Sequence, residues 1–321
     1  MGEFIVSARK YRPTTFKQVL GQSAITTTLS NAISENHLAQ SFLFCGPRGV
    51  GKTTCARILA KTINCQNISE KVEPCDKCES CTAFNESHSF NIHELDAASN
   101  NSVDDIRNLA DQVRFAPQVG NYNIYIIDEV HMLSASAFNA FLKTLEEPPS
   151  HAIFILATTE KHKIIPTILS RCQIFDFKRI STDDIVRHLI FVAKSENISA
   201  EQDALHIIAQ KSDGSLRDAL SIFDRLASFS KGITYQSVLD NLNILDHDYY
   251  FKITNSILDQ DISNALLTFN EIVENGFDGH HFINGLASHF RDLLVSKDTE
   301  TLVLLEKGKV LKEQYLSQSK L

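Results

Sequence analysis

Residues 46–53 read Gly-Pro-Arg-Gly-Val-Gly-Lys-Thr, the G-x-x-x-x-G-K-T pattern of a phosphate-binding loop. Its glycines let backbone N–H groups curl around an anion. The apolar run Phe42–Cys45 predicts a buried strand before the loop, and the pattern of Thr53–Ile63 predicts a helix after it, whose dipole favours the same anion. We expect Lys52 to reach the β- and γ-phosphates of a nucleoside triphosphate and Thr53 to hold Mg²⁺. A structural turn that matches the pattern by chance is the alternative.

A second apolar run, Asn123–Ile127, ends in the acidic pair Asp128 and Glu129. This is typical of a buried parallel strand with carboxylates at its carboxyl end, where α/β proteins bind ligands. Asp128 is expected to hold the Mg²⁺ that Thr53 also contacts, and Glu129 to polarise an attacking water. A core strand followed by a solvated turn is the alternative, and the upstream phosphate loop argues against it.

Two further segments carry weaker signals. The apolar run Ala152–Ala157 ends at Thr158-Thr159, where a hydroxyl can report the γ-phosphate, although a capping threonine is the commoner explanation. Arg217 follows Ser215, the expected N-cap of a helix. A cation so near a helix start is unfavourable for the helix dipole, which suggests a role beyond local stability. This segment alone favours a solvated surface arginine.

Four of the seven cysteines form a cluster with two overlapping C-x₂-C steps: Cys65, Cys75, Cys78 and Cys81. The spacing predicts a tetrahedral zinc site of four thiolates, and we interpret it as structural because no cysteine pairs with an obvious catalytic histidine. Disulfides and an iron–sulfur cluster are the alternatives. The other three cysteines lie in apolar segments and are interpreted as buried small hydrophobes: Cys45, Cys55 and Cys172.

The composition is that of an ordinary globular protein, with 43% hydrophobic and 22% charged residues among 321. There is no apolar run of membrane length and no signal peptide, so we expect a cytoplasmic protein without a membrane partner. The net charge of −8 argues against a wholly basic nucleic-acid binder. Residues 1–65 nevertheless hold eight basic against two acidic residues, which suits an anionic ligand and equally a solvated surface.

The motifs occur in an order that closely resembles the gamma/tau family of bacterial clamp-loader ATPases, members of the AAA+ class. The phosphate loop is followed by the cysteine cluster, the acidic pair, Thr158-Thr159 and Ser170-Arg171-Cys172. Further segments that resemble this family are Tyr11-Arg12-Pro13 with Phe16, Asp128–Leu133, Leu142–Pro149 and Gly214–Asp218. The resemblance covers nearly the whole chain.

The resemblance implies a nucleotide site that binds ATP and Mg²⁺. Its catalytic residues would be Lys52, Asp128, Glu129, Thr159 as first sensor with Thr158 as the alternative, Arg217 as second sensor and Arg171 as an arginine finger. Its nucleotide-binding residues would be Tyr11, Arg12, Pro13, Gly46, Pro47, Arg48, Gly49, Val50, Gly51, Lys52, Thr53, Thr54 and Arg217. Because the finger acts on ATP of the adjacent subunit, the isolated chain should be a poor ATPase.

The resemblance also implies a fold class and a domain order. Residues 1–180 would form the α/β AAA+ core, a parallel sheet flanked by helices with the zinc module inserted at about 65–90. Residues 181–243 would form a helical lid, and residues 244–321 the start of a helical collar. We expect helices at 103–113, 182–195, 201–211, 215–229, 249–258, 263–273, 280–295 and 300–311, and strands at 42–45, 123–127, 152–157 and 173–177. His280, His281 and His289 are interpreted as surface or packing residues.

The implied function is that of an ATP-driven motor that loads a sliding clamp onto primed DNA. Its partners would be the delta and delta-prime subunits, further ATPase copies, the clamp and DNA, in a hetero-oligomer. The chain holds no separate carboxylate constellation for nucleotidyl transfer, so polymerase chemistry belongs to the assembly. A branch-migration helicase and a scaffold that has lost hydrolysis are the alternatives. The cysteine cluster with Ser170-Arg171-Cys172 argues against the first, and the intact loop and acidic pair argue against the second.

Two features depart from the family. Residues 100–102 read Asn-Asn-Ser, whereas some relatives have a basic segment near DNA at this place. Any DNA contact here would be hydrogen bonding to phosphate, with little salt dependence. The chain also ends at Leu321, inside the expected collar. We therefore expect it to be a fragment or a truncated product of a longer protein.

Overall fold

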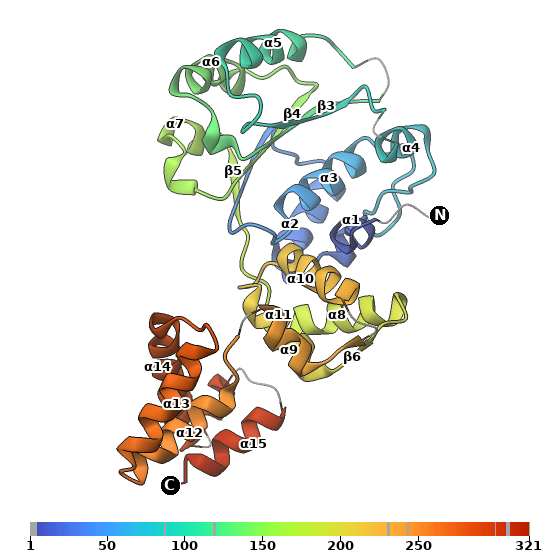
Figure 1. The fold of residues 1–321 in the computed structure, drawn as a ribbon. Coiled ribbons are helices and arrows are strands. Elements are labelled where there is room, and N and C mark those ends of the chain that lie inside the picture. Colours follow the sequence, from blue (N-terminus) through green and yellow to red (C-terminus); the bar gives the residue numbers. More distant parts are fainter. Residues whose placement is uncertain are drawn as a thin grey trace. The chain divides into compact units, whose positions relative to one another are not determined.

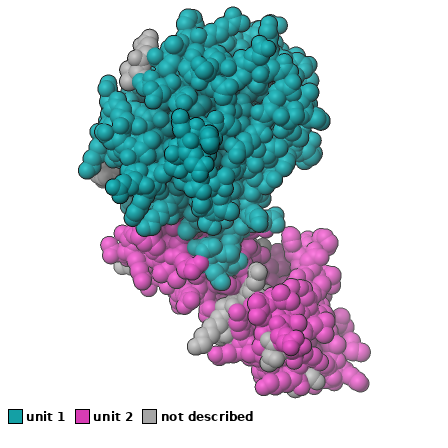
Figure 2. Space-filling model, turned by 180° about the vertical axis from the view of Figure 1, so that it is seen from behind, with its two compact units in different colours: residues 1–184, 214–218 teal, residues 185–213, 219–321 magenta. Residues whose placement is uncertain are grey.

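The computed structural model describes residues 5–86, 88–117, 120–229, 232–242, 244–298, 300–305 and 309–320 (Figure 1). The chain divides into two compact units, coloured separately in Figure 2. Unit 1 comprises Met1–Asp184 and Gly214–Asp218, and unit 2 comprises Ile185–Asp213 and Ala219–Leu321. The three domains expected from the sequence, with bounds at 180 and 243, remain a prediction, because this division gives two units.

Unit 1 is built on a parallel sheet of five strands in the order β2-β3-β4-β1-β5. The strands are β1 (Ser41–Cys45), β2 (Ile92–Asp96), β3 (Asn123–Asp128), β4 (Ala152–Thr158) and β5 (Gln173–Asp176). Short β-branched and aromatic apolar runs favour such strands, because a parallel sheet is covered on both faces. The parallel α/β architecture expected from the sequence is confirmed.

Helices lie on both faces of this sheet (Figure 1). Successive strand residues point to opposite faces, so β1 feeds two separate cores. Phe42 and Phe44 pack in one core with α3, while Leu43 packs in the other with α5 and α6. The helical segments of this unit are α1 (Ser7–Lys10), η1 (Phe16–Gln18), α2 (Ser23–Ser34), α3 (Lys52–Ile63), α4 (Glu79–Asn85), α5 (Val103–Val113), η2 (Val130–Met132), α6 (Ala135–Glu146), η3 (Lys161–Lys163) and α7 (Pro166–Leu169).

Serine caps set the beginnings of several helices. The Ser102 hydroxyl accepts from the Asp105 N–H at 3.2 Å, and the Asp105 carboxylate accepts from the Ser102 N–H in return. Ser181 and Ser215 likewise accept from the N–H three residues later, at 3.2 Å each. Such a bond satisfies one of the N–H groups that a helix start leaves without an intrahelical partner.

Unit 2 is helical apart from one short parallel strand pair, β6 (Ser199–Ala200) with β7 (Gly232–Ile233). Its helical segments are α8 (Thr182–Ser195), which begins in unit 1, α9 (Gln202–Lys211), α10 (Leu216–Phe229), which also begins in unit 1, α11 (Tyr235–Leu242), α12 (His247–Leu258), α13 (Ile262–Glu274), α14 (Gly279–Ser296), η4 (Thr301–Leu304) and α15 (Lys309–Gln318). In the part of the chain that the structure describes, no helix is both long and apolar enough to cross a membrane.

The helix expected over residues 300–311 is not continuous. A 3-10 turn covers Thr301–Leu304, residues 306–308 lie outside the described residues, and α15 begins at Lys309. The apolar residues 302–305 follow one another, so they do not form a single helical stripe. Leu305 is buried while Val303 is exposed, as a short turn allows.

Phe154 in β4 offers a test of the core around the sheet. It is fully buried, with its ring centroid 5.5 Å from that of Tyr125 and 5.3 Å from that of Phe141. We expect Phe154→Ala to lower the free energy of unfolding in urea by about 3–5 kcal/mol. Phe90→Ala, at a side chain that is 80% exposed, should change it by less than about 0.5 kcal/mol. Equal losses for both variants would contradict this packing.

Gly46 offers a second test, because it joins β1 to the phosphate loop. Its φ is +144°, and a Cβ there would meet the Phe177 carbonyl oxygen. We expect Gly46→Ala to add an overpacking cost of about 1–3 kcal/mol to the backbone strain of about 1–3 kcal/mol. Gly120→Ala should cost only the backbone strain, because φ is +81° there and the nearest atom to an added Cβ would lie 3.6 Å away. A smaller loss of unfolding free energy for Gly46→Ala than for Gly120→Ala would contradict the close approach.

Candidate nucleotide site and four-cysteine centre

The expected nucleotide-site residues of the loop, the acidic pair and Thr158-Thr159 gather at one edge of the sheet. The strands β1, β3 and β4 run parallel, and Cys45 at the end of β1 is in register with Thr158 at the end of β4. The loop leaves this edge directly, and the Gly46 N–H donates to the Thr158 carbonyl at 3.2 Å. Residues that follow the three strands therefore share the edge where ligands bind in α/β folds.

The loop 46–51 turns sharply into α3. Gly46, Gly49 and Gly51 all have positive φ, at +144°, +73° and +104°. Such angles favour glycine, and they turn successive N–H groups toward one concavity that suits an anion. Gly51 is the N-cap of α3, so the positive end of the helix dipole also points there.

Lys52 is the first residue of α3, and only 6% of it is exposed. Its ammonium donates to the carbonyl oxygens of Gly46 at 2.8 Å and Pro47 at 2.7 Å, across the mouth of the loop. Burial lowers the pKa of Lys52, while the nearby carboxylates of Glu129 and Asp128 act in the opposite sense. The cation is thus held beside the anion cradle.

Thr53 and Asp128 meet although they are 75 residues apart in the chain. The Thr53 hydroxyl donates to the Asp128 carboxylate at 2.6 Å. The other carboxylate oxygen of Asp128 accepts from the Glu129 N–H at 2.9 Å. A hydroxyl and a carboxylate are the oxygen donors that Mg²⁺ prefers, so the pair fits the ion expected from the sequence.

Glu129, the acidic residue after Asp128, is held by a threonine that directly follows the neighbouring strand β4. Glu129 has φ +47°, an unusual value for a non-glycine residue that turns the chain out of β3. The Thr159 hydroxyl donates to the Glu129 carboxylate at 3.0 Å. Thr158 is fully buried instead, and its hydroxyl lies 3.0 Å from His131 Nδ1 and accepts from the Glu160 N–H. The structure therefore separates the two expected sensor candidates, and only Thr159 contacts Glu129.

His131 is a residue of this cluster to which the sequence analysis assigned no role. Its side chain is only 6% exposed, with Nδ1 3.4 Å from a Glu129 carboxylate oxygen and Nε2 3.2 Å from one of Glu160. Lys163 donates to Glu160 at 2.7 Å and is the main cause of the lowered pKa of that carboxyl group. The sequence signal that could have pointed to His131 was its position two residues after Glu129. A single histidine at such a position is not specific enough to assign a role.

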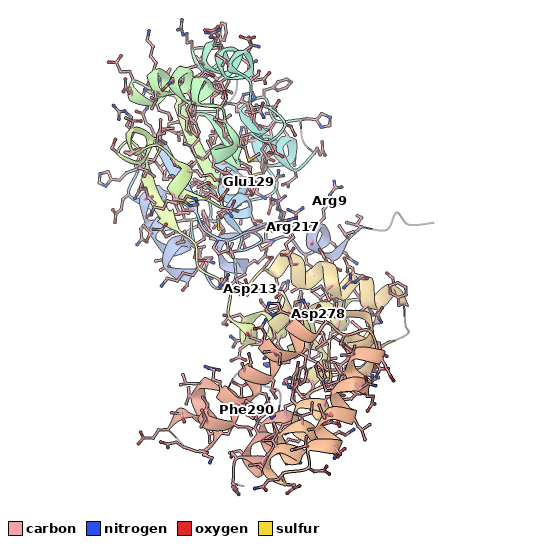
Figure 3. The ribbon with its side chains drawn as sticks, turned by 60° about the vertical axis from the view of Figure 1, so that its left-hand side comes forward. Arg9, Glu129, Asp213, Arg217, Asp278 and Phe290 are labelled. Carbon is pink, nitrogen blue, oxygen red and sulfur yellow. The ribbon has the colours of Figure 1, made fainter. Side chains whose placement is uncertain are left out.

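Two arginines of unit 1 approach the loop. The Arg12 guanidinium donates from Nε to the Thr54 hydroxyl at 3.2 Å. A Cβ on Gly49 would lie 3.2 Å from the Arg217 Cβ, so Arg217 sits against the loop (labelled with Arg9 and Glu129 in Figure 3). The pKa of Arg12 is lowered by desolvation first and then by Arg57, while Glu94 raises it. The site is thus rich in cations.

The remaining expected nucleotide-binding residues differ in exposure. Tyr11 follows α1 and lies under the Lys10 ammonium, which is 5.6 Å from its ring centroid. Pro13 is half-buried and Arg48 is exposed, whereas Val50 is buried in the core beside α3. Val50 thus packs the loop rather than presenting a side chain to a ligand.

Arg171 has other partners than the loop. It follows α7, and its guanidinium donates to the Glu146 carboxylate at 2.6 Å and to the Thr167 carbonyl at 2.8 Å. Glu146 is the last residue of α6. Arg171 is thus tied to a second helix of the core, and the structure does not join it to Lys52 or Thr53.

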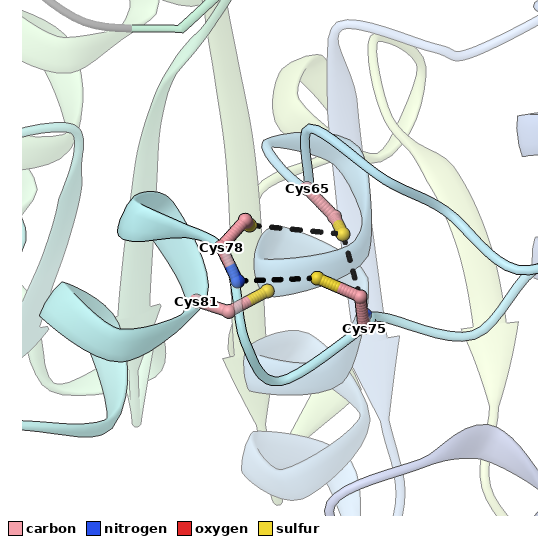
Figure 4. A group of neighbouring side chains, drawn as sticks. All are labelled: Cys65, Cys75, Cys78 and Cys81. Atoms are coloured by element: carbon pink, nitrogen blue, oxygen red, sulfur yellow. Dashed lines mark hydrogen bonds between the residues drawn. The ribbon is translucent and has the colours of Figure 1, made fainter.

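The four clustered cysteines converge on one point (Figure 4). Their Sγ atoms all lie within 4.8 Å of one another, and Cys65 Sγ lies 4.0 Å from Cys78 Sγ. Four sulfurs arranged tetrahedrally around zinc at about 2.3 Å would be about 3.8 Å apart, so the donors fit such an ion. All seven cysteines are free, which excludes a disulfide as the explanation of this geometry.

Backbone N–H groups act on these thiols. The N–H groups of Lys77 and Cys78 lower the pKa of the Cys75 thiol to about 6, whereas burial raises the pKa of Cys65 and of Cys81. The thiolate is the form that binds a metal, so Cys75 is prepared for it at neutral pH.

The other three cysteines differ from this cluster. Burial raises the thiol pKa of Cys45 to about 11 and those of Cys55 and Cys172 to about 12. They are protonated at neutral pH. Cys45 and Cys55 are buried as expected, whereas Cys172 is only half-buried where it packs against the core. The histidines of unit 2 also behave as expected. His280 and His281 are exposed, and His289 is buried with Nδ1 2.9 Å from the Tyr315 hydroxyl.

Two family models match the chain. The model described as "DNA polymerase III, delta subunit" covers residues 21–181. The model described as "DNA polymerase III clamp loader subunit, ATPase lid domain" covers residues 184–232. The first match holds the whole phosphate loop and acidic pair, and the second holds Arg217.

Curated relatives are similar along most of the chain. DNA polymerase III subunit tau of Bacillus subtilis is 46% identical over 94% of this chain and 54% of its own length. Subunit gamma of Buchnera aphidicola (Baizongia pistaciae) is 43% identical over 83% of this chain and 72% of its own, and subunit tau of Escherichia coli is 41% identical over 85% and 42%. The chain thus spans about half the length of the tau relatives.

Solved structures share the fold. The RuvB Holliday junction branch migration motor of Thermotoga maritima has a TM-score of 0.55 and covers 77% of this chain and 79% of its own, at 19% identity. A likeness at that identity shows the AAA+ fold alone, whereas the relatives above share the sequence of the site as well. The chain belongs to the gamma/tau family of DNA polymerase III clamp-loader subunits.

Proposed function

We propose that this chain is the ATPase motor subunit of a bacterial clamp loader and that it hydrolyses ATP at the loop 46–54. The observation that supports this best is the contact of Thr53 with Asp128 at 2.6 Å beside Glu129. It joins the phosphate loop, a metal ligand pair and a general base at one edge of the sheet. Family membership and the AAA+ fold support the same activity.

The residues divide the work of hydrolysis among them. The loop N–H groups and Lys52 neutralise the charge of the β- and γ-phosphates. Thr53 and Asp128 hold Mg²⁺, which when bound adds charge stabilisation at the phosphate oxygens. Glu129 orients the attacking water and takes up its proton. Thr159 keeps the Glu129 carboxylate in place through its hydrogen bond.

Two arginines complete the site in this proposal. Arg217 contacts phosphate as the second sensor, in keeping with its place against Gly49. Arg171 is proposed to serve the ATP of an adjacent subunit, in keeping with a guanidinium that contacts Glu146 and not its own loop. A finger supplied by a neighbour makes hydrolysis depend on assembly, so the isolated chain hydrolyses ATP slowly.

The work done with this ATP is the placing of a sliding clamp on primed DNA. The proposed partners are the delta and delta-prime subunits, further gamma/tau copies, the clamp and DNA, all in the bacterial cytoplasm. The relatives named as gamma and tau subunits support this assignment. The family model described as a clamp-loader lid supports it too.

The alternatives have less support. A branch-migration helicase shares the fold at 19% identity, while gamma and tau subunits reach 41–46%. A scaffold without hydrolysis would not need Asp128, Glu129 and Thr159 joined to the loop.

The four-cysteine centre is proposed to hold a structural zinc ion. Its donors are all sulfur, which zinc accepts in closed tetrahedral sites. Four cysteine sulfurs would fill all four positions of such a site, which leaves none open for a substrate. A zinc ion here would be held by Cys65, which follows α3, by Cys78, the N-cap of α4, and by Cys75 and Cys81.

Steady-state ATP hydrolysis by the chain with delta and delta-prime subunits, with and without clamp and primed DNA, tests the proposed function. Glu129→Gln should lower the rate about 10²- to 10⁴-fold while nucleotide still binds, because only the proton acceptor is lost. Lys52→Ala should lose nucleotide binding. Arg171→Ala should lower the stimulated rate about 10³-fold or more.

Arg114→Ala is the matched control for Arg171→Ala, because Arg114 is an exposed arginine of the same unit outside the site. It should leave the rate unchanged. Vigorous hydrolysis by the chain alone that Arg171→Ala does not alter would refute the finger and leave a self-sufficient ATPase.

Metal analysis tests the zinc proposal. The purified chain should hold about one equivalent of zinc, as expected for one closed four-thiolate site. Cys81→Ser should lose it, because a hydroxyl is a poor ligand for this ion. Cys172→Ser, outside the cluster, should keep it. Iron and sulfide in place of zinc would show an iron–sulfur cluster instead.

A further inference from the structure

The segment 12–19 lies against the phosphate loop and its helix. Arg12 donates to the Thr54 hydroxyl at 3.2 Å, and a Cβ on Gly51 would lie 3.9 Å from Val19 Cγ1. Between them Phe16 is 3% exposed and packs in the core that α3 helps to form. The segment therefore contacts the residues on either side of Lys52 and Thr53, namely Gly51 and Thr54.

One carboxylate holds the middle of this segment. Both oxygens of Glu73 accept backbone N–H bonds, one from Phe16 and one from Lys17, at 2.9 Å each. Glu73 is 57 residues away in sequence from Phe16 and belongs to the loop between Cys65 and Cys75. Paired hydrogen bonds to an ionised carboxylate are stronger than neutral ones, so this contact is specific in direction and position.

The Glu73 backbone is itself fixed by a tight turn. The Ser69 N–H donates to the Glu73 carbonyl at 3.0 Å, and the Glu73 N–H donates back to the Ser69 hydroxyl at 3.1 Å. Val72, within the turn, has φ +58°. Glu73 is thus presented by a turn that two hydrogen bonds close.

The same loop is tied to α3. The Cys75 N–H donates to Cys65 Sγ at 3.3 Å, just after α3 ends. The Lys61 ammonium, buried near the end of α3, pairs with the Asp76 carboxylate. The four-cysteine module therefore contacts both the segment 12–19 and the helix that begins at Lys52.

We propose that Glu73 is a positioning residue for nucleotide binding, through which the four-cysteine module holds the segment 12–19 against the phosphate-loop helix. The inference rests on the proposed nucleotide site. Without the paired contact, the N–H groups of Phe16 and Lys17 lose their acceptor, and Arg12 and Val19 are no longer held beside the loop. With the contact in place, the four-cysteine module links the segment 12–19 to α3; we call this link the clasp.

The test compares Glu73→Gln with Glu70→Gln in the whole chain. Gln has one acceptor oxygen and no charge, so it does not replace the paired contact. Glu70 is an exposed carboxylate three residues earlier that leaves the clasp untouched. Three quantities are measured: zinc content, hydrogen exchange of a peptide spanning residues 11–19, and the Kd of a fluorescent mant-labelled ADP.

We expect Glu73→Gln to keep its zinc, to exchange the Phe16 and Lys17 amides about tenfold faster and to raise the Kd about tenfold. Glu70→Gln should match the unaltered chain in all three. Chelation of the zinc should speed exchange of the same two amides, because the turn that presents Glu73 then loosens.

The outcomes distinguish a failure of the proposed nucleotide site from a failure of the positioning role of Glu73. If the unaltered chain does not bind the labelled ADP, the proposed function fails and the inference fails with it. If that chain binds and Glu73→Gln binds equally well, the inference alone is wrong. Faster exchange of the two amides at an unchanged Kd would likewise show a purely structural contact.

Discussion

Parallel pairing of β1 with β4 on one side and β5 on the other is the constraint on which the nucleotide site depends. It brings the carboxyl ends of β1 and β4 into register, so the loop that leaves Cys45 begins beside Thr158. With β3 as the next neighbour of β4, Asp128 and Glu129 arrive at the same edge.

The helix α3 links this edge of the sheet to the cysteine cluster. It begins at the phosphate loop with Lys52 and ends two residues before Cys65. A helix is stiff over such a length, so the anion cradle at one end and the sulfur cluster at the other cannot shift independently. The phosphate loop and the cysteine cluster are therefore mechanically coupled through α3.

The local sequence pattern was enough to predict many of the strands and helices and the cysteine cluster. The strands at 42–45, 123–127 and 152–157 were predictable because short apolar runs end in polar residues, and the helix Thr182–Ser195 because Ser181 caps it. The cysteine spacing predicted the cluster that the structure shows. Contacts between distant residues were not predictable, since nothing near Arg171 in sequence indicates Glu146, and nothing near Phe16 indicates Glu73. The continuous helix predicted over residues 300–311 was wrong at Thr301–Leu304, since the consecutive apolar residues 302–305 do not share one face of a helix.

The pair of Arg171 with Glu146 has a consequence for how subunits would come together. Both side chains are partly exposed, at 33% and 46%, and a pair in water contributes little net free energy, about 0–1 kcal/mol. Exchanging Glu146 for another anion is therefore nearly free of cost. The contacts with Glu146 and the Thr167 carbonyl nonetheless hold the long side chain in one conformation, so less rotamer entropy is lost when the guanidinium meets a new partner. Within the proposed function, Glu146 therefore keeps the guanidinium ordered and can be exchanged for a neighbouring subunit's phosphate at little cost in free energy.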